Sequence, residues 1–337
     1  MKILITGGTG FLGRHLVWRA AAEGAQVVFT GRNATAAQEV MRLAPRPVAW
    51  QTLEHGTPDA AASLRTLAQG TDAIIHCAAL SAPWGTPEAF HRANVVSTQE
   101  VLDAGHAAGT RRLIHVSTPS LYFGFADRLD IREDAALPPP ANEYVRTKTL
   151  AETLVRQNPL PETVIVRPRA LFGAWDQTLV PRLLRVMQRG ALPLMRGGNI
   201  SMDLTYIDNA VEAIWLALTR PLPRPLATYN ITNGEPRQLQ DMLTIMAREF
   251  RLPLRTRRVP WWLIDKVAHL LELHARWGDG REPLLTRYSA GVMAFSQTLN
   301  IDALRNELGY RPQVSIEEGI RRHAAWLRDE QQTGSNR

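Results

Sequence analysis

Tyr144 and Lys148 are the residues whose types and spacing point most directly to chemistry. Because they are four positions apart, their side chains would project from the same face of a helix. Reduction of a carbonyl group needs a proton donor, and a tyrosine fills that role near neutral pH only when its pKa is lowered. A neighbouring ammonium group lowers it by stabilising the phenolate. With three lysines and six tyrosines in the chain, a chance match is uncommon, so the pair predicts a general acid–base centre. The alternative is a solvated pair on a helix surface.

A glycine-rich segment, Thr6-Gly7-Gly8-Thr9-Gly10-Phe11-Leu12-Gly13, follows directly on the apolar run 2–6. Gly7 would allow a tight turn, Gly10 would let the backbone approach a pyrophosphate, and Gly13 would let the next helix pack on the strand. Free amides at the start of that helix would hold the anion. A strand, a glycine turn and a helix in this order predict a dinucleotide site, whereas an isolated glycine pattern could be a structural turn.

The end of the second apolar run bears on which dinucleotide binds. An NAD site usually carries an acidic residue there for the ribose 2′-hydroxyl, whereas an arginine accommodates a 2′-phosphate. This chain has Thr30-Gly31-Arg32-Asn33 and no acid. Arg32 therefore favours NADP(H), with NAD as the alternative cofactor and a solvated surface arginine as the alternative role for Arg32.

The elements that must hold these residues alternate between strand-like and helix-like segments. This alternation predicts an α/β fold, a Rossmann-type doubly wound parallel sheet with right-handed crossovers, and a smaller, mostly helical substrate domain. We expect a dinucleotide-binding domain over 1–170, to which 204–234 returns, a substrate-binding part over 171–330, and a disordered tail at 331–337. The expected strands are 2–6, 26–30, 72–76, 112–117, 163–167 and 228–232, and the expected helices are 11–22, 88–109 and 142–157, with another after 208.

Four motifs together resemble the extended short-chain dehydrogenase/reductase family, which includes epimerases, dehydratases and 3β-hydroxysteroid dehydrogenases. They are Thr6-Gly-x-x-Gly10-x-x-Gly13, His76-Cys-Ala-Ala79, Asn94-Val-x-Ser-Thr98 and Tyr144-x-x-x-Lys148. The segments 167–173, 179–184, 233–236 and 311–319, with the Ser-Thr-Pro-Ser run at 117–120, favour the 3β-hydroxysteroid dehydrogenase-like branch.

The resemblance assigns roles to individual residues. It implies that Tyr144 is the general acid/base, that Lys148 also holds the nicotinamide ribose, and that Thr118 orients the substrate oxygen. Ser117 and Ser120 are alternatives to Thr118, and contacts from Asn142 or Glu143 remain open. The usual Gly-Asp motif after the third strand is replaced by Gln51-Thr52-Leu53, which leaves adenine recognition open, and His76 is expected to be a packed strand-end residue. The implied cofactor contacts are Gly7, Thr9, Gly10, Phe11, Leu12, Gly13, Arg32, Ala78, Lys148 and Pro168.

The substrate half favours a small hydrophobic ligand. Met202 stands where nucleotide-sugar members of the family often have a phosphate-binding arginine, and a methionine cannot pair with a diphosphate. Trp84 lies in the expected substrate loop, and Trp261-Trp262 opens an amphipathic segment at 260–273 that could pack in the core, cover the substrate or meet a membrane surface. We expect oxidation and reduction at a 3-oxo/3-hydroxy group of a hydrophobic substrate that is fatty-acyl-like or steroid-like. A nucleotide-sugar epimerase or dehydratase is the alternative, and a non-catalytic cofactor-sensing regulator is the second alternative.

Composition excludes several other classes. The net charge of +7 comes from scattered arginines, since lysine occurs at three positions and 36 of the 39 basic residues are arginine. Without a basic tail or an aromatic-interleaved patch, nucleic-acid binding is not expected. The single cysteine, Cys77, rules out a disulfide framework and a multi-cysteine metal site, and no metal is expected. No run of about eighteen apolar residues and no signal peptide appear, so we expect a cytoplasmic protein with at most peripheral membrane contact. A homodimer is left open.

Overall fold

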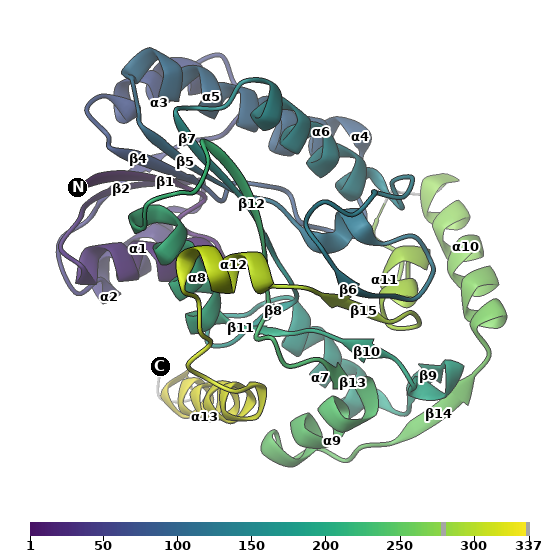
Figure 1. Ribbon diagram of the computed structural model, residues 1–337. Helices are drawn as coiled ribbons and strands as arrows, with labels where there is room; N and C mark the ends of the chain where they lie inside the picture. The colour runs from purple at the N-terminus through teal and green to yellow at the C-terminus, as the bar shows by residue number, and fades with distance from the viewer. Residues whose placement is uncertain (278–280, 335–337) are drawn as a thin grey trace.

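The computed structural model describes residues 1–277 and 281–334 and is built around one seven-stranded parallel sheet. The strand order is β12-β7-β5-β4-β1-β2-β3 (Figure 1). The chain adds strands outward from β1 on one side and outward from β4 on the other, and doubly wound sheets bind their ligands at such a switch point, here between β1 and β4. The expected Rossmann-type fold is confirmed. The strands are β1 Lys2–Thr6, β2 Gln26–Gly31, β3 Ala49–Thr52, β4 Ala73–His76, β5 Arg112–Val116, β7 Glu162–Pro168 and β12 Leu226–Ile231.

Helices cover both faces of this sheet, so its central strands are apolar on both sides. Ile3, Leu4 and Ile5 of β1, for example, are fully buried. One face packs on α1, α2 and α8, and the other on α3, α5 and α6. These helices are α1 Phe11–Ala22, α2 Ala34–Leu43, α3 Ala60–Ala68, α5 Ser97–Ala108, α6 Glu143–Gln157 and α8 Ile207–Thr219.

The helix expected over 88–109 is interrupted. A short helix, α4 (Pro87–Phe90), leads into a π-helical segment, η1 (His91–Val96), and only then into α5. In the π segment Asn94 is buried and its side chain bonds both backbone polar groups of Leu80, at 2.7 and 3.2 Å. The same amide donates to Thr147 Oγ1 on α6 at 3.0 Å. The irregular helix therefore fixes the loop after β4 against α6, in keeping with the occurrence of π-helical turns at functional sites.

The structure also contains three small sheets that the sequence did not indicate, and their strands come from the second half of the chain except for β6. One sheet has the order β13-β10-β15-β6, and two pairs, β11-β8 and β14-β9, complete the set. The strands are β6 Arg128–Ile131, β8 Leu171–Phe172, β9 Leu192–Met195, β10 Ser201–Met202, β11 Thr205–Tyr206, β13 Arg237–Gln238, β14 Thr256–Val259 and β15 Gln297–Leu299. The remaining helices are η2 Pro119–Tyr122, α7 Leu179–Arg189, η3 Arg196–Gly198, α9 Leu239–Glu249, α10 Trp261–Trp277, α11 Arg287–Val292, α12 Asp302–Leu308 and α13 Ile316–Gly334.

The C-terminal segment differs from the expectation. We expected disorder from 331, but α13 continues to Gly334, because its packed N-terminal part is extended by good helix formers such as Glu330 and Gln332. Residues 335–337 lie outside the described residues.

In the described part of the chain, no helix is both long enough and apolar enough to cross a bilayer. The division of the chain at residue 170 stays a prediction, although β12, from the returning segment 204–234, is an edge strand of the main sheet.

Candidate active site

The glycine turn lies at the switch point of the sheet, between β1 and β4. Gly7 has φ +69°, and a Cβ there would come within 2.7 Å of the backbone nitrogen of Ala78, just after β4. A Cβ on Gly13 would overlap the carbonyl group of Gly7. Gly10 caps α1 with no side-chain cap, so the amides of the first turn are free to bind an anion. These residues fit a bound dinucleotide. The other expected contacts lie at the same edge of the sheet: Thr9 in the turn, Phe11 and Leu12 at the start of α1, and Pro168 at the end of β7.

Arg32 lies one residue beyond β2 and is exposed. Its neighbour Asn33 caps α2 by accepting a hydrogen bond from Ala36 N at 3.0 Å. Arg32 itself has no hydrogen bond or ion pair with another described residue. Thr9 packs against the Cα of Gly31, so the glycine turn and the end of β2 are in contact. The guanidinium is therefore available to an anion bound beside the turn.

Tyr144 and Lys148 both lie on α6, which begins at its N-cap Asn142. Lys148 is buried, and its Nζ donates a 2.7 Å hydrogen bond to the carbonyl oxygen of Val116, the last residue of β5. Burial lowers the pKa of Lys148 to about 8, against an opposing effect of Glu152 and Cys77. The pair is thus held at the carboxyl edge of the sheet, as the proposed chemistry requires.

Three hydroxyl groups gather next to this pair. Thr118 follows β5 and donates to Ser120 Oγ at 3.0 Å, and the Tyr288 hydroxyl donates to the same oxygen at 2.6 Å. Tyr288 is close enough to Tyr144 for their charges to interact, and burial raises the Tyr288 pKa. Ser117 is buried, and its hydroxyl makes no hydrogen bond to Thr118, Ser120 or Tyr288. The geometry therefore favours Thr118 or Ser120 over Ser117 as the hydroxyl that faces a substrate.

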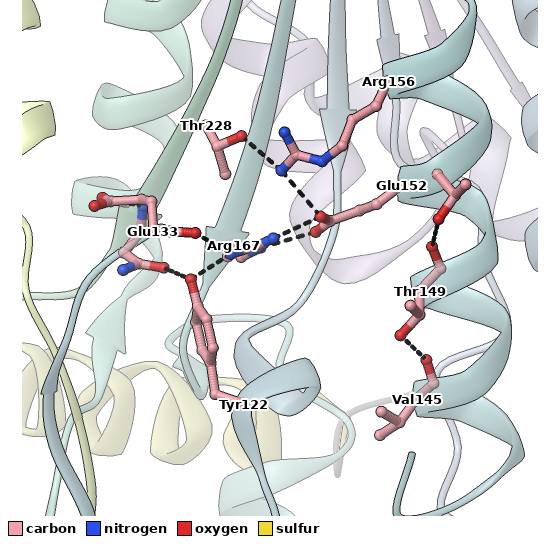
Figure 2. Close-up of polar contacts among 10 residues, drawn as sticks. Tyr122, Glu133, Val145, Thr149, Glu152, Arg156, Arg167 and Thr228 are labelled. Carbon is pink, nitrogen blue, oxygen red and sulfur yellow. Dashed lines mark hydrogen bonds and ion pairs between the residues drawn. The ribbon is translucent and has the colours of Figure 1, made fainter. Parts of the chain in front are cut away.

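A buried ion pair anchors α6 to the sheet (Figure 2). Glu152 on α6 accepts two hydrogen bonds from Arg167 on β7, at 2.8 and 2.6 Å. Burial alone would raise the pKa of Glu152, but the bonds and charge of Arg167 hold it below its usual value. Arg167 also donates to the hydroxyl of Tyr122, and Arg156 links Glu152 to Thr228 on β12. This network fixes the helix that carries Tyr144 and Lys148.

A cavity of about 800 Å³ opens beside the N-terminal end of α6. Phe90 lines it, and the Phe90 ring centre is 6.4 Å from that of Tyr144. Its walls come from the loop 83–87, the start of α6, α10 and α11, with Pro83, Trp84, Phe125, Leu273 and Tyr288 as apolar surface. Trp84 is therefore at the cavity as expected. Trp261 instead packs on Phe295, with 5.3 Å between ring centres, and Trp262 is 60% exposed, so neither lines the cavity.

Two residues flagged by the sequence are structural. His76 is buried between Thr6 Oγ1 and Thr98 Oγ1, at 2.7 and 3.2 Å, and burial lowers its pKa well below the usual value. Met202 is buried on β10 among core side chains. The contribution of Tyr288 could not be found from the sequence, because it comes from a helix 168 positions away from Ser120 and no local motif marks it.

The family model described as NAD dependent epimerase/dehydratase matches residues 3–232. The chain belongs to this family. Among relatives, the uncharacterized protein YbjS of Escherichia coli (strain K12) is 36% identical over 98% of both chains. A 2-alkyl-3-oxoalkanoate reductase of Stenotrophomonas maltophilia is 33% identical over 96% of this chain and 98% of its own. The resemblance to extended short-chain dehydrogenases/reductases is confirmed, and this chain is an NAD(P)-dependent oxidoreductase or epimerase of that type.

A solved UDP-glucuronic acid 4-epimerase from Bacillus cereus, in complex with NAD, is similar in fold. Its TM-score is 0.73 and its sequence is 22% identical, over 98% of this chain and 99% of that one. At this level of identity the likeness concerns the arrangement of the backbone. It therefore supports the doubly wound fold and carries no information on the substrate of this chain.

Proposed function

We propose that the protein is an NADP(H)-dependent oxidoreductase that interconverts a 3-oxo and a 3-hydroxy group on a hydrophobic substrate. The observation that carries this proposal is the Tyr144–Lys148 pair at the carboxyl edge of the sheet, next to a cavity. The walls of this cavity combine aromatic and aliphatic side chains with the charged side chains of Glu143, Arg146, Glu272, Arg276 and Arg287. A similar protein is named a 2-alkyl-3-oxoalkanoate reductase, which supports a fatty-acyl-like substrate. The acyl chain would lie along Trp84, Phe125 and Leu273.

In this proposal each residue of the site has a separate role in the reaction. A bound nicotinamide cofactor supplies or accepts the hydride. Tyr144 gives a proton to the substrate oxygen during reduction and takes it back during oxidation, so that ketone, hydride and proton together make the alcohol. The ammonium group of Lys148 stabilises the phenolate left on Tyr144. Thr118 and Ser120, joined to Tyr288, hold the substrate oxygen towards Tyr144.

The cofactor contacts follow the same reasoning. The turn formed by Gly7, Gly10 and Gly13 would hold the pyrophosphate, and Arg32 would hold a 2′-phosphate. Lys148 would bind the nicotinamide ribose, with Ala78 and Pro168 close by. We further infer a cytoplasmic enzyme, because a chain with a single cysteine, Cys77, cannot form a disulfide framework of the kind that many secreted proteins carry. A homodimer stays a prediction.

A chain-length series tests the substrate. Each buried methylene contributes about 0.8 kcal/mol, so kcat/KM for 3-hydroxy acids should rise about fourfold per added carbon until the cavity is full. The series is run with NADP⁺ and with NAD⁺, beside UDP- and dTDP-sugars. Turnover of the sugars without any response to alkyl length would replace this proposal by a nucleotide-sugar epimerase or dehydratase.

A further inference from the structure

Arg169 is a buried arginine without a partner. It follows β7 directly, at the carboxyl edge of the sheet, and is 5% exposed. Its backbone is bonded to Ile231 and Thr205, but its guanidinium has no hydrogen bond or ion pair with any residue that the structure describes, and Nε is fully buried. Arg167, two residues earlier, is equally buried and fully bonded to Glu152. Since an unpaired buried charge is strongly destabilising, Arg169 calls for a ligand.

The nearest acid does not serve as that ligand. The charge of Asp203 reaches Arg169, but the two make no ion pair, and Asp203 Oδ2 accepts a 2.7 Å hydrogen bond from Leu299 N instead. Burial raises the pKa of Asp203 to about 6. A close ion pair with a guanidinium would have lowered it. The positive charge of Arg169 is therefore not neutralised within the described chain.

Arg169 lies next to the reaction centre. The Tyr288 hydroxyl is within electrostatic reach of both Arg169 and Tyr144, and it donates to Ser120 Oγ. Tyr288 also lines the cavity. Tyr288 therefore connects Arg169 with the wall of the cavity, which Arg169 itself does not line.

We propose that Arg169 binds a carboxylate group of the substrate, so that the enzyme acts on free 3-oxo or 3-hydroxy acids and discriminates against their esters. This inference rests on the proposed function. A guanidinium matches a carboxylate in shape and can donate two parallel hydrogen bonds, and such charge-assisted bonds are strong away from water. The apolar part of the cavity, at Trp84, Phe125 and Leu273, would then take the chain while Arg169 and Tyr144 hold the polar end.

The test distinguishes recognition of the carboxylate from recognition of the rest of the ligand. Binding of decanoate and of methyl decanoate is measured by calorimetry on the NADP⁺-loaded protein, and oxidation of 3-hydroxydecanoate and its methyl ester is followed in parallel. Arg169→Met should weaken decanoate binding and kcat/KM for the acid by roughly 10- to 100-fold, with the ester and NADP⁺ within about twofold. Arg248→Met removes the same charge from an exposed, ion-paired site and is the control. Arg169→Met should also unfold at the same or a higher temperature, because it removes an unpaired buried charge.

Four results would overturn the proposal. Equal loss of acid and ester binding would make Arg169 a structural residue, as would a lower unfolding temperature. Loss of NADP⁺ affinity would assign Arg169 to the cofactor. Equal binding of decanoate and its ester by the parent protein would show that the protein does not recognise the carboxylate. If neither hydroxy compound is oxidised while decanoate binding still depends on Arg169, the proposed reaction fails and the anion site stands.

A second surface carries an independent inference. Helix α10 lies at the edge of the molecule and packs on α11 (Figure 1). Its inward side includes the buried Ala268, whereas its outward side exposes large apolar residues, with Leu270 65% and Trp277 87% exposed. We call this side the outer face of α10. Its exposed apolar residues are Trp262, Leu263, Val267, Leu270 and Trp277.

Charge is divided between the two sides of α10. Its acids turn inward, where Asp265 pairs with the Arg287 side chain at 2.7 Å and Glu272 accepts a 2.7 Å bond from Arg287 N. Lys266 lies over the ring of Trp262, 5.5 Å from its centre. Exposed arginines lie at or beside β14, just before the helix, and they have no ion pair with other described residues. They are Arg255, Arg257 and Arg258.

We propose that the outer face of α10 docks on an anionic phospholipid bilayer. An exposed apolar helix face, with basic residues close by in the chain, is typical of segments that bind an anionic membrane surface. The same charges would repel a second copy of this face, which disfavours a dimer through it. Since His269, Leu273 and Arg276 of α10 line the cavity, docking would bring the cavity wall next to the lipid, where an apolar substrate would be dissolved.

Vesicle sedimentation with the full chain tests this docking. Phosphatidylcholine vesicles are compared with vesicles containing phosphatidylglycerol, at low and high salt. The parent should bind the anionic vesicles in a salt-sensitive way, and Arg257→Gln with Arg258→Gln should weaken that binding about 30-fold. Leu270→Ser with Trp277→Ser should abolish it, whereas Leu129→Ser, which changes an equally exposed leucine on β6, should not. Absence of binding to either vesicle, unchanged binding by the variants, or dimerisation of the parent that Leu270→Ser abolishes would overturn the proposal.

Discussion

Lys148 is a buried ammonium group whose hydrogen-bond partner is the carbonyl oxygen of Val116. Burial lowers its pKa from 10.5 to about 8, which means that the unfolded chain holds this proton more tightly than the folded one. The parent should therefore gain stability as the pH rises from about 8 to 10.5, and should carry the full penalty of the charge below pH 8.

Replacing Lys148 with methionine tests this penalty. At pH 7 and without cofactor, Lys148→Met should raise the free energy of unfolding by up to about 3 kcal/mol, because it keeps the chain of methylenes and removes the charge. The difference should shrink towards zero near pH 10.5. Urea unfolding at several pH values measures it, and a variant that is less stable than the parent at pH 7 would contradict the reasoning. Oxidoreductase activity should be lost even where stability is gained.

Tyr144 should carry the proton transfer. Tyr144→Phe removes the hydroxyl and keeps the ring that packs near Phe90, so the fold and cofactor binding should be unchanged. Turnover should fall by roughly 10²- to 10⁴-fold, the usual worth of general acid catalysis. Thr118→Ala should lower turnover less, because Ser120 and Tyr288 remain hydrogen-bonded beside it. Steady-state kinetics with a saturating substrate measures both, and near-normal turnover in Tyr144→Phe would refute its role.

At the scale of elements, the ion pair between Glu152 and Arg167 joins α6 to β7. Arg167→Met leaves Glu152 buried, with Arg156 at 3.4 Å as its remaining ion-pair partner among the described residues. An uncompensated buried charge destabilises by about 3–5 kcal/mol, and urea unfolding should show a loss of that size. Combining Glu152→Leu with Arg167→Met should restore much of the lost stability, because the buried carboxylate of Glu152 is then removed.

The surface pair formed by Arg111 and Glu162 supplies a matched control. Arg111 is largely exposed and bonds Glu162 Oε1 at 2.6 Å. Since exposed ion pairs contribute about 0–1 kcal/mol, Arg111→Met should change stability by less than 1 kcal/mol. A loss as large as that of Arg167→Met would mean that burial is not what distinguishes the two pairs.

The sequence predicted elements whose pattern is local and missed those that depend on distant segments. Strands such as β1 and β5 are covered on both faces, so each appears as a continuous apolar run beside a turn. In contrast, β6 and β15 are short and pair across about 170 positions. Neither is long enough to show the alternation of apolar and polar residues that identifies a strand in a sequence. The same limit applies to the site, because Lys148 and Gly13 belong to local motifs, whereas Tyr288 and the partnerless state of Arg169 exist only after folding.

Across the whole molecule, the two halves of the chain meet at the reaction centre. The glycine turn, Lys148 and Thr118 come from the first half, and Tyr288 and α10 come from the second. A cofactor bound across the switch point would contact α1, β4 and α6 together. Its binding should therefore be visible in the stability of the entire fold and not only in activity.

Cofactor preference can be measured through that stability. A ligand that binds only the folded state stabilises it by about 2.7 kcal/mol at one hundred times its Kd. Because Arg32 is exposed and without a partner in the described chain, it can make a charge-assisted bond to a 2′-phosphate worth roughly 1.5–3 kcal/mol. NADPH should therefore raise the unfolding temperature more than NADH at equal concentration, and Arg32→Ala should remove the difference. Arg42→Ala, which removes an exposed arginine from α2, should leave it intact. Equal shifts by both cofactors in the parent would contradict the preference for NADP(H), and a larger shift with NADH would assign the enzyme to NAD.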